Sequence, residues 1–158
     1  MTSLPTTTGF RASIRLADQL QRVLVELIAL QLNGKQAHWN VVGPNFRDLH
    51  LQLDEIVELT RDAGDTIAER MRALEAVPDG RPATVAATTA LPELPSGEQN
   101  TGTIVDLIVE QLHRTAAVLR EVHDDIDAED PSTADLLHQI IDGIEKQAWL
   151  LGSENRIV

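Results

Sequence analysis

The chain has 158 residues and a formal net charge of −12, with 42% hydrophobic residues, 3% aromatic residues and no cysteine. This length suits a single domain whose core is aliphatic. The lack of cysteine excludes disulfides, thiolate ligands and cysteine nucleophiles, so any metal must be bound by oxygen and imidazole. With only two lysines, Lys35 and Lys146, the acidic folded body is a poor direct partner for nucleic acid.

Residues 1–13 are rich in threonine and contain Pro5 and Gly9, which predicts a flexible tail. They lack a basic start followed by an apolar run, and no later stretch has the ~20 apolar residues of a membrane span. A soluble, cytoplasmic protein with no membrane partner is therefore expected. Residues 14–41 carry apolar side chains at helical spacing and predict the first long helix.

A Gly-Pro pair at residues 43–44 predicts a break after this helix. Asn45 is a suitable N-cap for the next helix, with Asp48 placed for a return contact in the first turn. The second helix is predicted over residues 46–76 and ends before Pro-Asp-Gly at 78–80.

Residues 81–100 contain several Pro and Gly breaks and predict a long connection, with a short helix near residues 84–88. Long helices are expected at residues 103–128 and 131–154, the last starting after an Asp130 cap with proline at its first position. We therefore expect an all-α fold in which residues 14–158 form a ferritin-like four-helix bundle, with a long crossover between the second and third long helices.

The second helix carries a group of possible metal ligands. With His50 at zero on a helical wheel, Asp54 lies at roughly 40°, Asp65 at roughly 60° and Glu69 at roughly 100°. All four share one face, and His50/Asp54 and Asp65/Glu69 each have the i,i+4 spacing that lets two side chains converge. Imidazole together with carboxylate suits a cation such as iron.

The helix axis separates these two pairs. At ~1.5 Å per residue, Asp54 and Asp65 lie about 16 Å apart and His50 and Glu69 about 28 Å apart, so they cannot surround one ion. A second copy of the helix packed antiparallel about a two-fold axis would bring each pair opposite the other. His38, at the end of the first helix, could fold back onto the His50 pair. The spacing thus predicts a metal site between subunits.

The segment resembles the Dps proteins (DNA-binding proteins from starved cells), which are twelve-subunit mini-ferritins. The resemblance rests on His38-Trp39-Asn40, Gly43, Phe46, Leu49-His50, Asp54-Glu55, Asp65 and Ala68-Glu69-Arg70, and it extends to Thr133-Ala134-Asp135-Leu136 and Glu145-Lys146 with Trp149. It covers nearly the whole folded body.

This resemblance implies a ferroxidase site in which His38, His50 and Asp54 of one subunit act with Asp65 and Glu69 of its two-fold mate. Two Fe(II) ions would bind there and be oxidised, preferably by hydrogen peroxide rather than O2. The ferric mineral would be stored inside a hollow dodecameric shell, which implies protection against oxidative damage in the bacterial cytoplasm or nucleoid.

The resemblance also suggests roles for residues outside the five ligands. Glu55, and less strongly Glu58, are candidates for mineral nucleation on the inner surface, although either could be an ordinary surface acid. Trp39 and Trp149 are expected near the ferroxidase site, where their rings could intercept radicals or simply pack. Asp130 and Asp135 are candidates for acidic three-fold pores, but Asp130 could instead only cap the last helix.

Two alternatives remain at this point. Glu110-x-x-His113 and Asp135-x-x-His138 have the i,i+3 spacing of di-iron sites inside one bundle, with Glu26 as a further carboxylate, although surface histidines are the simpler interpretation. The second alternative is a mainly structural, nucleoid-compacting DNA-binding protein with weak ferroxidase activity. The acidic charge and the absence of a lysine-rich tail argue against direct DNA binding.

Overall fold

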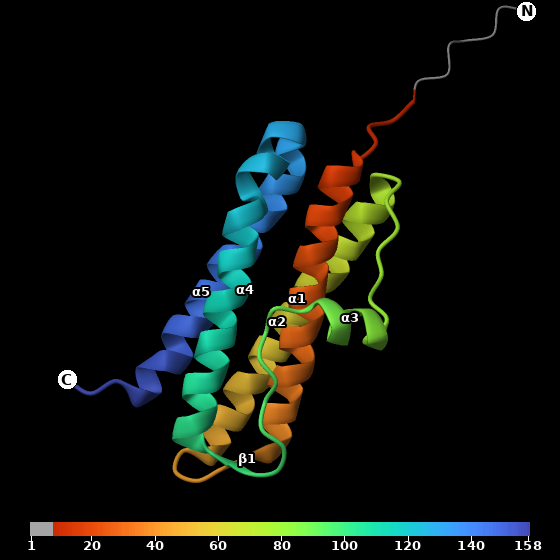
Figure 1. Cartoon of the computed structure of the whole chain (residues 1–158). Coiled ribbons are helices and arrows are strands. Elements are labelled where there is room, and N and C mark those ends of the chain that lie inside the picture. The colour runs from red at the N-terminus through yellow and green to blue at the C-terminus, as the bar shows by residue number, and fades with distance from the viewer. Residues whose placement is uncertain (1–7) are drawn as a thin grey trace, which may run out of the picture.

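The computed structural model describes residues 8–158, so residues 1–7 of the predicted tail lie outside the described residues. The elements are, in chain order, α1 (Ile14–Asn40), β1 (Val41–Val42), α2 (Phe46–Ala73), α3 (Pro82–Thr88), β2 (Gln99–Asn100), α4 (Thr101–Glu129), α5 (Pro131–Gly152) and the 3-10 turn η1 (Ser153–Asn155). Four long helices form a bundle, with a crossover between α2 and α4 (Figure 1). The predicted all-α, ferritin-like class is confirmed.

The bundle consists of two helical pairs, α1 with α2 and α4 with α5. Its core is aliphatic, as the composition predicts, because most leucine, isoleucine and valine residues at helical spacing are buried between the helices. Fully buried examples from each long helix are Leu27, Leu53, Leu119 and Ile144. The α1–α2 turn with β1 and the α4–α5 turn lie at opposite ends of the bundle (Figure 1).

The α1–α2 turn differs from its prediction in one respect. Asn45 occupies the N-cap position of α2, but its φ of 59° is left-handed and its side chain makes no capping hydrogen bond. Its amide instead donates to Glu154 just beyond α5. The predicted Asn45 cap is therefore wrong, because the tight turn after Gly43 (φ 118°) places Asn45 in a conformation that points its side chain away from the helix amides.

Helix α2 ends at Ala73, three residues earlier than predicted. Glu75 takes a left-handed φ of 61°, and the Ala76 amide donates back to the Met71 carbonyl at 2.8 Å. This closes the helix as a left-handed C-terminal cap does. The prediction used the later Pro78 as its stop signal, because a glutamate carries no sequence signal for left-handed backbone.

The crossover is bound to the bundle by two buried polar side chains. Glu26 of α1 is 4% exposed, and its carboxylate accepts from the Thr89 hydroxyl and the Ala90 amide, both at 2.8 Å. Gln111 of α4 is fully buried and donates to the Pro92 carbonyl at 3.0 Å. β1 and β2 then pair in parallel next to the α1–α2 turn, a two-residue contact that the sequence did not predict.

Ser13, immediately before α1, is bound both to the start of α1 and to the end of α4. Ser13 caps α1 by accepting from the Leu16 amide at 3.0 Å. Glu129 at the end of α4 accepts from both the amide and the hydroxyl of Ser13, at 2.8 and 2.7 Å. Within residues 8–158, no helix combines the length and the hydropathy that a membrane crossing requires.

Candidate metal site

His38 and His50 come together where α1 and α2 meet. Their rings stack with centroids 3.7 Å apart and planes 17° from parallel. Each ring contacts the other residue's backbone: His38 Nδ1 lies 2.7 Å from the His50 carbonyl, and His50 Nδ1 lies 2.8 Å from the His38 carbonyl. The ring of Phe46 packs against His50 at 5.2 Å, and His38 is 8% exposed.

These contacts fix the chemistry of both rings. A carbonyl oxygen can only accept, so each Nδ1 must carry a hydrogen and donate it. In the neutral rings, Nε2 then holds the free lone pair, which is the atom that binds a metal. Metal-binding histidines commonly have their second nitrogen held in this way. The pair is therefore prepared to offer two nitrogen ligands.

Asp54 lies one turn after His50 and is held by Lys35 of α1. Lys35 Nζ donates to Asp54 Oδ1 at 2.6 Å, and both side chains are about one third exposed or more (34% and 42%). The hydrogen bond from Lys35, together with the nearby His38 and His50 rings, holds the pKa of Asp54 below its ordinary value despite partial burial. Asp54 is thus a carboxylate at neutral pH.

The ligand pattern in the sequence did not predict the role of Lys35, because lysine is not itself one of the expected metal ligands. One signal could have found it: Lys35 and His38 are three residues apart, which places them on the same face of a helix. It is the cation that balances the Asp54 charge in this structure.

Asp65 and Glu69 lie further along α2, and both are exposed. The arginines near them in sequence pair with other acids: Arg61 Nε lies 3.5 Å from Asp62 Oδ1, and Arg70 Nη2 lies 2.7 Å from Asp130 Oδ2. Within residues 8–158, neither Asp65 nor Glu69 takes part in an ion pair. They therefore form a second acidic pair on α2, whose charge no Lys or Arg of the described residues neutralises.

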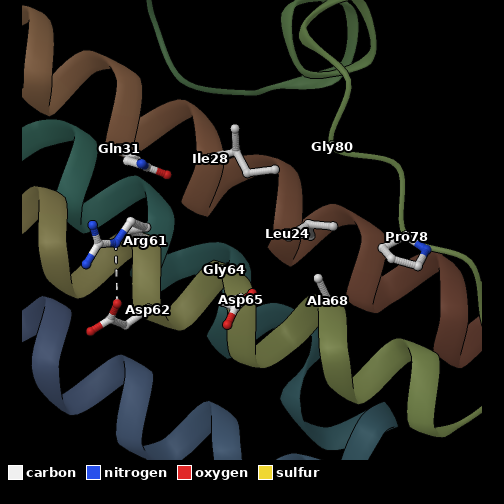
Figure 2. A pocket seen from close by; sticks show the side chains of 10 residues that line it. All are labelled: Leu24, Ile28, Gln31, Arg61, Asp62, Gly64, Asp65, Ala68, Pro78 and Gly80. Carbon is white, nitrogen blue, oxygen red and sulfur yellow. Dashed lines mark ion pairs between the residues drawn. The ribbon is translucent and has the colours of Figure 1, made fainter.

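Two surface cavities lie along α1 and α2 beside Asp54 and Asp65. Asp65 lines a cavity of about 520 Å³ between α1, α2 and the start of the crossover (Figure 2). Asp54 and Lys35 line a second cavity of about 340 Å³, and Gln31 and Arg61 border both. One carboxylate of each predicted pair, Asp54 and Asp65, thus lines one of two neighbouring cavities.

One chain does not close a metal site. Within the described part of the chain, no three His, Asp or Glu side chains gather where they could bind an ion. The five predicted ligands therefore fall into three parts: the stacked His38/His50 pair, Asp54 paired with Lys35, and the Asp65/Glu69 pair. Asp54 and Asp65 are about 16 Å apart along α2.

The residues with predicted supporting roles are placed as follows. Trp39 is 67% exposed and lines the same cavity as Asp54 and Glu58. Trp149 on α5 is 63% exposed, and its proximity to the ligands stays a prediction. Glu55 is exposed on α2, and its role in nucleation also stays a prediction.

The two candidate pore residues differ in their environment. Asp135 is exposed near the start of α5. Asp130 is 7% exposed and accepts from Arg70 and from the Thr133 hydroxyl, while making no side-chain cap of α5. Burial raises the pKa of Asp130, but the Thr133 and Arg70 hydrogen bonds outweigh it and lower the pKa below its ordinary value. In this structure Asp130 therefore serves an internal ion pair.

The alternative di-iron site inside the bundle is not assembled. Glu110 pairs with Arg114 at 2.7 Å on the exposed surface of α4, and His113 is exposed. Glu26 is buried but fully used by the crossover.

Comparison with known proteins agrees with the fold. The family model of the ferritin-like domain matches residues 17–155. The DNA protection during starvation protein of Agrobacterium fabrum is 35% identical over 84% of this chain and 82% of its own length. DNA protection during starvation protein 2 of Deinococcus radiodurans is 37% identical over 82% of this chain, but the match spans only 54% of that longer protein.

Solved structures give the same result. Dps92 from Deinococcus radiodurans superposes with a TM-score of 0.85 at 34% identity, covering 88% of this chain and 84% of that one. Dps from Microbacterium arborescens in the high iron form superposes with a TM-score of 0.85 at 33% identity, covering 92% and 98%. The chain therefore belongs to the ferritin-like family and, within it, to the DNA protection during starvation (Dps) proteins.

Proposed function

We propose that this protein binds and oxidises Fe(II) at sites shared by two subunits and stores the ferric product in a dodecameric shell. In each site, His38, His50 and Asp54 of one chain face Asp65 and Glu69 of a second copy related by a two-fold axis. Two such sites form per dimer, because a two-fold axis repeats every contact.

The observation that carries this proposal is the separation of the two ligand groups along one face of α2. Each group suits a cation: backbone carbonyls orient the histidine rings, and the acidic pair has no cationic partner among residues 8–158. The cavities beside Asp54 and Asp65 are lined partly by the apolar side chains of Leu24, Ile28 and Leu32, a surface suited to an opposing helix.

The residues then have separate tasks. The two Nε2 atoms and the Asp54 carboxylate would bind iron from one side, and the Asp65 and Glu69 carboxylates would bind it from the other. Lys35 must give up Asp54 when iron arrives, and its ammonium could then stay near the carboxylates as a counter-charge. The substrate is a pair of Fe(II) ions held within one site.

The reaction balances with peroxide as the oxidant. Each of two Fe(II) ions gives one electron, the O–O bond of one hydrogen peroxide breaks, and hydrolysis of the two Fe(III) ions releases protons. Because both electrons are taken together by one peroxide, no hydroxyl radical is released, which accounts for a protective role.

Anaerobic loading with Fe(II), followed by peroxide titration, tests this proposal. We expect two Fe(II) oxidised per peroxide and two per site. The second candidate function is compaction of DNA with weak iron chemistry, which the names of the relatives favour. Shifted DNA on a gel with no saturable iron oxidation would support that candidate and contradict ours.

A further inference from the structure

A second pair of histidines lies outside the proposed iron site, in the half of the bundle nearer the α4–α5 turn. His123 of α4 and His138 of α5 stack with ring centroids 4.6 Å apart and planes 26° from parallel. Their Nε2 atoms point at each other and are 2.6 Å apart. The two side chains are 22% and 58% exposed, so solutes can reach them.

An aspartate carboxylate lies on the Nδ1 side of each ring. Asp124 Oδ1 lies 2.9 Å from His123 Nδ1, within hydrogen-bonding distance. Asp135 Oδ1 lies 3.6 Å from His138 Nδ1, too long for a hydrogen bond but close enough to attract a hydrogen there. A carboxylate can only accept, so Nδ1 of His123 carries the hydrogen and its Nε2 carries the lone pair. The carboxylate behind a histidine is also the usual second partner of a metal-binding imidazole.

Two Nε2 atoms 2.6 Å apart need a hydrogen or a metal ion between them or beside them, because two bare lone pairs would repel each other. A proton is one solution and a metal ion is another. With an ion–nitrogen distance of about 2.0–2.1 Å, two nitrogens at a right angle on one ion would be about 2.9 Å apart, and at a tetrahedral angle about 3.3 Å apart. The rings need to open by only a few tenths of an ångström to reach the right-angled arrangement.

The surroundings leave room for further ligands. A cavity of about 200 Å³ beside the rings is lined by Arg120, Asp124 and Ile141 as well as by the two histidines. The one cation in this lining, Arg120, is paired with Glu145 through contacts of 2.8 and 2.7 Å, so its charge is largely balanced. Water could complete the coordination of an ion from this cavity.

We infer that His123 and His138 form a binding site for a divalent late first-row transition ion that takes two imidazoles at a right angle, as copper(II) and nickel(II) do. Each chain carries both ligands, so the site does not need a second subunit. This inference does not depend on the proposed iron oxidation, so a test of one does not decide the other.

Copper(II) binding by the assembled protein tests the inference. The number of tightly bound Cu(II) ions per chain is measured by equilibrium dialysis for the unaltered protein and for His123→Gln and His138→Gln. We expect both variants to bind one ion fewer per chain. The difference in electron paramagnetic resonance spectra between the unaltered protein and His123→Gln should show coupling to two nitrogens.

His113→Gln is the matched control, because His113 is an exposed histidine of α4 outside the pair, and this variant should bind as many ions as the unaltered protein. Asp124→Asn should keep the site but weaken it roughly 10- to 100-fold, as loss of a carboxylate behind a ligand does. Both pair histidines are on the surface of long helices, and glutamine is a good helix former, so the variants should fold. Equal copper counts in the unaltered protein and in the His123→Gln and His138→Gln variants would overturn the inference and leave a shared proton between the rings.

Discussion

Replacement of Asp65 should separate iron oxidation from folding. Asp65 is exposed and unpaired within the described chain, so Asp65→Ala should change the free energy of unfolding by no more than about 0.5 kcal/mol. Loss of a carboxylate behind a metal ligand costs 10- to 100-fold, and loss of a ligand itself should cost at least the upper value. We therefore expect iron oxidation to slow by roughly 100-fold or more, about 2.7 kcal/mol in the barrier.

The assay is the rate of Fe(III) formation after peroxide is mixed with anaerobically loaded protein, and size-exclusion chromatography reports on assembly. Asp62→Ala is the matched control, because Asp62 is also exposed on α2 and lies three residues from Asp65, but is not one of the predicted ligands. It should oxidise iron at the unaltered rate. The assignment is refuted if Asp65→Ala, still assembled, keeps that rate as well.

Two further predictions concern the bundle itself. Arg70→Met should leave the buried Asp130 carboxylate unpaired and destabilise the fold by about 3–5 kcal/mol, measured by urea unfolding, whereas the neighbouring exposed Arg72→Met should have little effect. Folding lowers the pKa of Asp130, so the Arg70–Asp130 pair stabilises the fold above the ordinary aspartate pKa of 3.8 and loses this effect as the pH falls below it. The free energies of unfolding of the two variants should therefore converge in acid. Glu26→Ala should leave the Ala90 amide without its acceptor, cost about 1–3 kcal/mol and expose the crossover to proteolysis; an unchanged proteolytic pattern would contradict its anchoring role.

The sequence predicted the long helices well because their apolar spacing is sustained over many turns. Their ends were less predictable: Glu75 and Asn45 both take left-handed backbone, and neither position carries a glycine that would mark it. The β1–β2 pairing joins residues nearly 60 positions apart, from 41 to 99, and no local pattern encodes it.

The candidate site was predictable in its ligands and not in its details. The i,i+4 spacings on α2 and the ~16 Å between Asp54 and Asp65 follow from helix geometry alone. The reciprocal contact of His38 and His50 with each other's carbonyls depends on how the α1–α2 turn closes, and the Lys35–Asp54 pair depends on how the two helices pack. Neither of these contacts can be predicted without the tertiary structure.

The central claim, that each iron site is shared by two chains, is tested most directly by complementation. One variant carries His50→Ala with Asp54→Ala, and the other carries Asp65→Ala with Glu69→Ala; alone, each should fail to oxidise iron. Co-produced in equal amounts, half of the dimers should be mixed, and each mixed dimer contains one intact site of two. The account predicts recovery of about one quarter of the unaltered activity. Activity no higher than that of the separate variants, in assemblies shown to contain both chains, would contradict it.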